Sequence, residues 1–106
     1  MITVVNVRDE GVLAALKAGD AQFVYCGRAM GRMGLKASKW ANPFKVGIDG
    51  NRFECIEAYR KRMQFKPDLV AALPELQGKT LVCFCAPQSC HCDVLKEMAE
   101  ALEVSK

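Results

Sequence analysis

Residues 80–102, TLVCFCAPQSCHCDVLKEMAEAL, change from a strand pattern to a helix pattern around one turn. The apolar run at residues 80–85 predicts a strand. Pro87 disfavours its continuation and predicts a turn. The apolar residues beyond the turn recur at helical spacing, and they are Val94, Leu95, Met98, Ala99 and Leu102. We therefore expect a strand, a cysteine-rich turn and an amphipathic helix that packs on the sheet.

Two more strand patterns lie closer to the N-terminus. The β-branched run at residues 2–5 predicts a buried strand, which we expect to be central. Residues 22–26 predict another strand, and Gly27 directly after it lets the backbone turn or lie close to a ligand. The polar residues that follow these two strands are Asn6, Arg8 and Arg28.

Three helix patterns separate the strands. Residues 9–18 place apolar side chains at helical spacing. Asn51 and Glu54 have the spacing of a helix cap, and Pro67 can open a shorter helix that Pro74 ends or kinks. The stripe expected to face the core after Asn51 comprises Phe53, Ile56, Tyr59 or Arg60, and Met63.

Strands that alternate with helices predict an α/β layered fold. With 106 residues, of which 51% are hydrophobic, the chain is the size of one domain, so we expect a single α/β domain over residues 1–106. Its central sheet should have at least three strands, parallel or mixed, flanked by helices. In a parallel sheet, ligands are expected beyond the carboxyl ends of the strands.

Residues 28–50 show no sustained periodicity and predict one long loop, which Trp40 and Phe44 would anchor to the body. Positive charge concentrates here and in the following helix. Residues 28–66 carry ten basic and three acidic residues, a net charge of +7, whereas the flanks carry −1 and −3. This basic segment could bind phosphate in a nucleotide or nucleic acid, or it could form a solvated basic surface.

The sequence has no apolar segment long enough to span a membrane and no secretory leader pattern. We therefore expect a cytoplasmic protein with no membrane partner. In that compartment its six cysteines should be thiols or metal ligands rather than disulfides.

Four of these cysteines and the only histidine lie within residues 83–92. Alternate residues of a strand share a face, so Cys83 and Cys85 should point the same way, and the turn should return Cys90, His91 and Cys92 toward them. One interpretation is a zinc site, because thiolates and imidazole suit zinc. The Cys-x-Cys spacing is tighter than usual for zinc, and an iron-sulfur cluster, whose familiar spacings are also absent, is a weaker alternative.

A second interpretation is a reactive thiol. Cys90 or Cys92 would lie near the first turn of the last helix, where the helix dipole favours a thiolate, although Asp93 adds opposing negative charge. His91 would be the general base or an orienting partner, which makes Cys90, His91 and Asp93 the catalytic candidates. A third interpretation is that these thiols are packing residues and that His91 forms a hydrogen bond at a helix end.

Four motifs in this chain resemble a known family: residues 4–8 (VVNVR), 25–28 (YCGR), 38–44 (SKWANPF) and 81–95 (LVCFCAPQSCHCDVL). The chain resembles the family called domain of unknown function 4326, found in phages and bacteria. It departs from that family at Ala41, where relatives have glycine, and at Cys92, where they have a residue other than cysteine.

The resemblance implies that the motif residues converge on one site. It also implies that a metal shared by the family would be bound by Cys83, Cys85, Cys90 and His91, with Cys92 as a bystander. The implied set further includes Asn6, Arg8, Gly27, Arg28, Ser38, Trp40, Asn42, Pro43, Phe44 and Asp93.

From these patterns we expect a small protein that processes a nucleotide or nucleic acid, acting on a base or an N-glycosidic bond. Arg28 and the basic loop would hold phosphate, and Trp40 or Phe44 would stack on the base. The other expected substrate-binding residues are Asn6, Arg8, Gly27, Ser38 and Asn42. The alternative is a non-catalytic, zinc-stabilised module that binds nucleic acid or a host protein.

Overall fold

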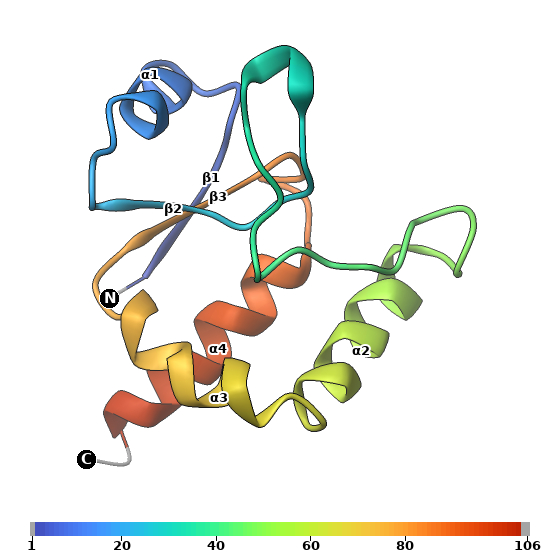
Figure 1. Ribbon diagram of the computed structural model, residues 1–106. Helices are drawn as coiled ribbons and strands as arrows, with labels where there is room; N and C mark the ends of the chain where they lie inside the picture. The colour runs from blue at the N-terminus through green and yellow to red at the C-terminus, as the bar shows by residue number, and fades with distance from the viewer. Residues whose placement is uncertain (1, 105–106) are drawn as a thin grey trace.

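The computed structural model describes residues 2–104 and shows a three-stranded sheet flanked by helices (Figure 1). The strands are β1 (Thr3–Asn6), β2 (Phe23–Tyr25) and β3 (Thr80–Cys83). The helices are α1 (Val12–Lys17), α2 (Arg52–Met63), α3 (Pro67–Ala72) and α4 (His91–Val104), with short 3₁₀ turns at Gly31–Met33 and Leu73–Leu76. Among the described residues, none of the helices is long and apolar enough to cross a membrane.

The sheet is entirely parallel, with the strand order β1-β3-β2. The expectation that β1 is central is therefore wrong, because β3 lies between the other two strands. Three of the four β3 residues are buried, whereas Thr3 of β1 is exposed. An apolar run indicates burial, but the pairing of strands distant in sequence determines which of them is central.

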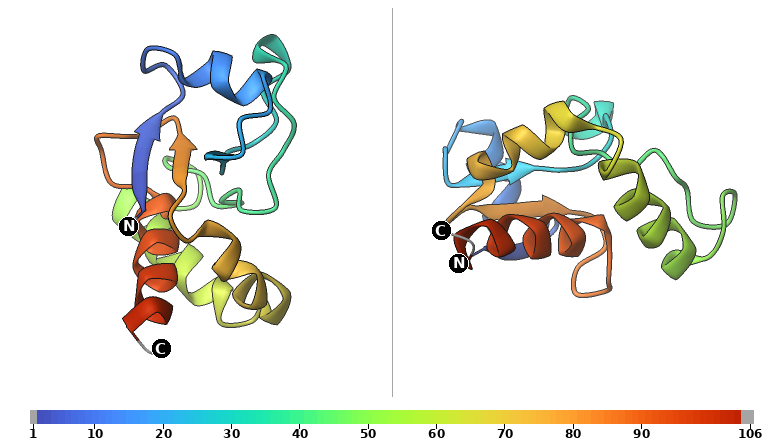
Figure 2. Two further views of the ribbon diagram at one scale, coloured as in Figure 1. Left: turned by 90° about the vertical axis from the view of Figure 1, so that its left-hand side faces the viewer. Right: turned by 90° about the horizontal axis from the view of Figure 1, so that it is seen from below.

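Alternate residues along each strand face two separate hydrophobic clusters. Val5, Tyr25 and Val82 face the side covered by α1, which lies above the sheet in Figure 1. The opposite side carries Leu81 and Cys83 and is covered by α2, α3 and α4. Viewed from below, α4 lies across this second face (Figure 2). The chain therefore has three layers, as the α/β expectation requires.

Helix α2 begins where the sequence predicts, at a complete capping box. The Asn51 side chain accepts a hydrogen bond from the Glu54 amide, and the Glu54 carboxylate accepts one from the Asn51 amide. The expected stripe is only partly correct, because the side chain of Phe53 is 69% exposed. The face turned to the core carries Cys55 instead of Phe53, together with Tyr59 and Met63, which the predicted stripe already contained.

The long connection between β2 and α2 is fixed to the body by Trp40. Its side chain is buried in the core between the sheet and helices α2 to α4. The buried hydroxyl of Tyr59 donates a 2.8 Å hydrogen bond to the Trp40 carbonyl oxygen. This attachment holds the basic connection beside the carboxyl edge of the sheet.

Candidate functional site

A cleft of about 620 Å³ opens at the carboxyl ends of the strands. Its walls come from the residues after β1, β2 and β3, from the connection between β2 and α2, and from the first turns of α2 and α4. Parallel strands end at one edge of the sheet, so segments distant in sequence meet there. The cleft therefore lies where the parallel fold predicts a ligand.

The charged groups that line the cleft are all basic: Arg8, Arg28, Lys45 and Arg52. No carboxylate is among the lining residues that the structure describes. Of the ion pairs formed by the described side chains, none includes these four residues. Basic groups without carboxylate partners favour an anionic ligand.

Asn6 holds the end of β1 against the turn that follows β3. Its side-chain amide donates hydrogen bonds to the carbonyl oxygens of Phe84 (3.1 Å) and Ala86 (2.9 Å). Its side-chain oxygen accepts a 2.9 Å hydrogen bond from the Arg8 amide. Asn6 does not line the cleft, so its interactions shape the cleft wall instead of contacting a ligand.

Phe84 lines one side of the cleft, and Tyr25 supports it from behind. The Phe84 ring packs edge-on against Tyr25, with the ring centroids 6.2 Å apart, and the Arg8 guanidinium lies 5.5 Å from the Phe84 centroid. The Tyr25 hydroxyl donates a 2.6 Å hydrogen bond to the Arg28 carbonyl oxygen. The Tyr25 side chain passes close to Gly27 on its way to the Arg28 carbonyl. A Cβ at position 27 would lie 2.5 Å from the Tyr25 hydroxyl oxygen, which explains the glycine there.

His91 begins α4 and lines the cleft with its ring mostly buried. Its Nε2 lies 2.7 Å from the Cys26 carbonyl oxygen, which can only accept a hydrogen bond, so Nε2 carries the proton. Burial lowers the pKa of His91, although the Cys26 carbonyl opposes this shift. The neutral ring therefore keeps an unprotonated Nδ1.

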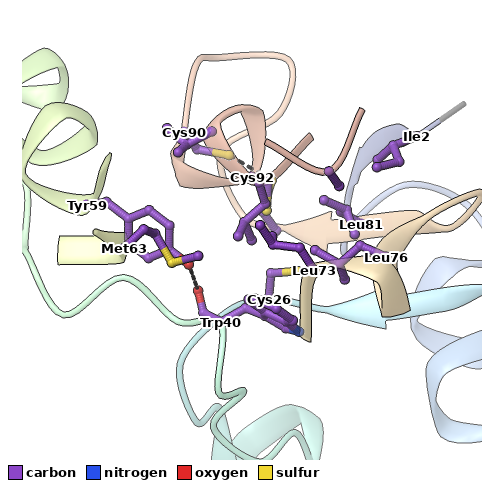
Figure 3. Close-up of a cluster of buried hydrophobic side chains, with 14 of the residues drawn as sticks. Ile2, Cys26, Trp40, Tyr59, Met63, Leu73, Leu76, Leu81, Cys90 and Cys92 are labelled. Atoms are coloured by element: carbon purple, nitrogen blue, oxygen red, sulfur yellow. Dashed lines mark hydrogen bonds between the residues drawn. The ribbon is translucent and has the colours of Figure 1, made fainter. Parts of the chain in front are cut away.

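Three buried thiols form a cluster beneath His91. The Sγ atoms of Cys83, Cys90 and Cys92 all lie within 4.8 Å of one another, and the Sγ atoms of Cys83 and Cys90 are 3.5 Å apart. The cluster sits between the sheet and the first turn of α4, as Figure 3 shows for Cys90 and Cys92. This three-thiol cluster could hold a metal ion.

The thiols influence one another strongly. Hydrogen bonds from the Cys90 and Cys92 thiols, together with the amides of Ala86 and Cys85, lower the pKa of Cys83. The pKa of Cys90 is raised chiefly by its hydrogen bond to Cys83. The pKa of Cys92 is raised chiefly by a hydrogen bond with the thiol of Cys26, and then by those with Cys83 and Cys90. The cluster thus favours one shared thiolate at Cys83, which is the form that binds a metal.

Asp93 stabilises the start of α4. Its carboxylate accepts a 3.0 Å hydrogen bond from the Cys90 amide, and its own amide donates to the Cys90 carbonyl oxygen. An acidic residue in the first turn also interacts favourably with the helix dipole. Asp93 does not line the cleft, so its position is that of a capping residue.

The predicted residues of the long connection are divided between the cleft and the core. Asn42 and Phe44 line the cleft, and the Asn42 side-chain oxygen accepts a hydrogen bond from the Phe44 amide. Ser38 and Trp40 do not line it, because the Ser38 hydroxyl accepts a hydrogen bond from the Trp40 amide and the Trp40 ring is buried. Of the two aromatic candidates for stacking, only Phe44 borders the cleft.

The structure therefore gathers most of the predicted site at one edge. The predicted residues that line the cleft are Arg8, Gly27, Arg28, Asn42, Phe44, Cys83, Cys85, Cys90 and His91. Cys85 and His91, predicted as metal ligands, are not in the three-thiol cluster, whereas Cys92, predicted as a bystander, is.

Sequence reasoning did not single out Lys45, Arg52 or Cys26 as residues of the site. The helix cap at Asn51 could have indicated Arg52, because the start of a helix often faces a ligand. Cys26 directly precedes Gly27 at a strand end, and that position could have indicated its proximity to Cys83.

A model of the family described as "Domain of unknown function (DUF4326)" matches residues 14–101. An uncharacterized protein of Acanthamoeba polyphaga mimivirus is 41% identical over 64 residues, which cover 58% of this chain and 48% of that relative. The chain thus spans about half the length of this relative. No solved structure matches the chain.

Proposed function

The chain belongs to the DUF4326 family, and we propose that it binds a nucleotide in the carboxyl-edge cleft and acts on its base or N-glycosidic bond. The observation that carries this proposal is the charge of the cleft, where four basic side chains meet no carboxylate among the described lining residues. A phosphate group would neutralise these charges through charge-assisted hydrogen bonds.

The rest of the cleft suits a base and a sugar. The apolar groups of its lining include Phe44, Ile56 and Phe84, and its volume of about 620 Å³ lies within the range of small-molecule sites. Phe84 and Phe44 offer aromatic surfaces on which a base can stack. An anionic end and an apolar end within one cleft match the two ends of a nucleotide.

Of the three catalytic candidates, His91 has the position best suited to contact a ligand. Cys90 is buried in the three-thiol cluster, and Asp93 caps α4. Because the Cys26 carbonyl holds Nε2–H, the Nδ1 of His91 can accept a hydrogen bond or a proton. In hydrolysis of an N-glycosidic bond, water adds to the sugar carbon and the base leaves with the bonding electron pair. His91 would accept the proton of that water, and the departing base would take up a proton from solvent, which regenerates the neutral ring when His91 releases its own.

We further assign zinc to the three-thiol cluster, because cysteine thiolates are the usual ligands of structural zinc sites. The cluster is buried, and it connects β3 to the first turn of α4. Zinc there would fix the turn that carries Cys85 and His91 along the cleft wall.

Isothermal titration calorimetry with nucleoside monophosphates tests the binding proposal. Arg28→Ala and Lys45→Ala should each weaken binding about tenfold, as expected for the loss of one charge-assisted contact. Lys61→Ala is the matched control, because this exposed lysine of α2 lies outside the cleft lining and should leave affinity unchanged. Equal affinities in all three variants would contradict a phosphate site in the cleft.

Catalysis is measured separately by chromatography of the free base released from the bound nucleotide. The wild-type protein should release the base, and His91→Asn should not, while still binding the nucleotide. A wild-type protein that binds nucleotides but leaves them intact would restrict the proposal to binding.

The buried thiol cluster supports a second candidate, a non-catalytic zinc-stabilised module that binds nucleic acid or a host protein through the basic segment at residues 28–66. Salt dependence separates the two candidates. Affinity for a polynucleotide falls steeply as salt rises, because each phosphate contact releases counterions. Affinity for a mononucleotide, with far fewer phosphates, should change only slightly over the same range.

A further inference from the structure

We propose that Cys26 is the fourth ligand of a closed, four-sulfur zinc site that it forms with Cys83, Cys90 and Cys92. The inference rests on the zinc assignment above and extends it in one respect. Three protein ligands leave a zinc ion with an open, catalytic position, whereas four thiolates close the site and make it structural. The identity of the fourth donor therefore determines the role of the metal.

Cys26 lies next to Cys83 on the neighbouring strand. Tyr25 pairs with Val82 in the parallel register, and the Cys26 amide continues that ladder with a 3.0 Å hydrogen bond to the Val82 carbonyl oxygen. Neighbouring strands are about 4.8 Å apart. Cys26 and Cys83 belong to the same hydrophobic cluster on the face covered by α4, and Cys26 has no exposed surface.

The start of α4 is attached to Cys26 through His91. The backbone carbonyl of Cys26 accepts a 2.7 Å hydrogen bond from His91 Nε2, and the Cys26 thiol also raises the pKa of the Cys92 thiol in the first turn of α4. In Figure 3, Cys90 and Cys92 lie close together at the start of α4, and Cys26 lies on the sheet side, beside Trp40. Three segments thus bring thiols to one place: the end of β2, the end of β3 and the first turn of α4.

The other nearby donors are less suitable. Cys85 is half-buried and lines the cleft, and it belongs to the partly buried shell around the core cluster. His91 uses Nε2 for the Cys26 carbonyl, so its ring is already oriented by that hydrogen bond. Cys55 is buried on α2, where its thiol faces the Gly50 carbonyl oxygen at 3.7 Å.

Ligation requires one local change. The Cys26 Sγ lies 3.5 Å from the Val24 carbonyl oxygen, so the side chain must turn from that oxygen toward the other three thiols. Cys83 already favours the thiolate, so each of the other three Zn–S bonds replaces an S–H bond, and the protons released pass to solvent. The resulting negative charge is compensated by the amide of Ala86, which lies 3.4 Å from the Cys83 Sγ, and by the N-terminal dipole of α4.

A closed site assigns the metal a structural role. Zinc would join β2, β3 and α4 beneath the cleft and would hold Gly27 and His91, which are adjacent to its ligands, in their places. The metal would then have no open position for water or substrate, and chemistry in the cleft would be left to His91 and the other lining residues.

X-ray absorption at the zinc edge of the purified wild-type protein tests this inference without any mutation. The expected spectrum shows four sulfur neighbours at about 2.3 Å. Cobalt-substituted protein gives a second measurement, because its sulfur-to-metal absorption should fall by roughly a quarter in Cys26→Ser, from four Co–S bonds to three. Cys85→Ser and Cys55→Ser are the matched controls and should retain the full absorption.

The outcomes separate this inference from the assignments on which it rests. Two results would overturn Cys26 as the fourth ligand while leaving the zinc assignment in place. One is a spectrum with one zinc per chain and three sulfur neighbours. The other is a cobalt absorption that falls in Cys85→Ser but not in Cys26→Ser. Protein that binds no zinc even when refolded with it would overturn both. Nucleotide binding is measured independently by calorimetry, so its failure would leave the four-sulfur site standing.

Discussion

Replacing Asn6 tests whether this residue holds the cleft wall or binds a ligand. Asn6→Ala removes two hydrogen bonds to the carbonyl oxygens of Phe84 and Ala86 and a more exposed one from the Arg8 amide. A net contribution of about 1 kcal/mol for each of the two part-buried bonds predicts a loss of about 2 kcal/mol in the free energy of unfolding. For a domain of this size the melting temperature should fall by roughly 10 °C.

Asn6→Asp distinguishes the direction of these hydrogen bonds. The substitution keeps the shape of the side chain but places a carboxylate oxygen against two carbonyl oxygens, so repulsion adds to the lost bonds. We expect a loss of about 3 kcal/mol at neutral pH, larger than for alanine.

Gln22→Ala is the matched control, because Gln22 donates a similar 2.8 Å hydrogen bond to the Gly78 carbonyl oxygen at an exposed position. It should cost less than about 0.5 kcal/mol. Urea unfolding followed by circular dichroism measures all three variants. If Asn6→Ala is no more destabilising than Gln22→Ala, or if Asn6→Asp is as stable as the wild type, Asn6 does not clamp the turn.

Three further substitutions test other contacts of the fold. Tyr59→Phe should lower the free energy of unfolding by about 1–2 kcal/mol in urea titrations, because the buried Trp40 carbonyl loses its donor; an unchanged value would contradict that hydrogen bond. Gly27→Ala should displace the Tyr25 ring, so its near-ultraviolet circular dichroism should change and nucleotide affinity should fall, and an identical spectrum would refute the steric argument. Asn51→Ala removes one half of the capping box and should cost about 1 kcal/mol in thermal unfolding, whereas no change would show that α2 does not depend on its cap.

The local elements of this fold were predictable because their signals are contiguous in sequence. The strand, turn and helix of residues 80–102 and the capping box at Asn51 all depend on neighbouring residues. The order of the strands was not predictable in this way, because it depends on pairing between distant segments. Phe53 illustrates a second limit, since two alternative stripes on α2 fit helical spacing and only tertiary packing selects the one that begins at Cys55 over the one that begins at Phe53.

The residues of the site were likewise predictable only in part. Arg8, Gly27 and Arg28 were predicted from their positions after strands, and parallel pairing brings all three to one cleft. The members of the three-thiol cluster were harder to predict, because Cys85 follows Cys83 at the same Cys-x-Cys spacing at which Cys92 follows Cys90. The strand ends before Cys85, whereas Cys92 lies in the first turn of α4 and points into the core, so backbone geometry beyond the motif selects Cys92.

The central claim is that the carboxyl-edge cleft binds a nucleotide, and amide NMR spectra of labelled protein titrated with a nucleoside monophosphate test it most directly. Nucleotide binding should cause the largest shift changes at Gly27, Arg28, Phe84 and His91, while the amides of α3, which does not line the cleft, remain unchanged. A titration to millimolar nucleotide that leaves the cleft amides unmoved, or that shifts only amides outside the cleft, would contradict the claim.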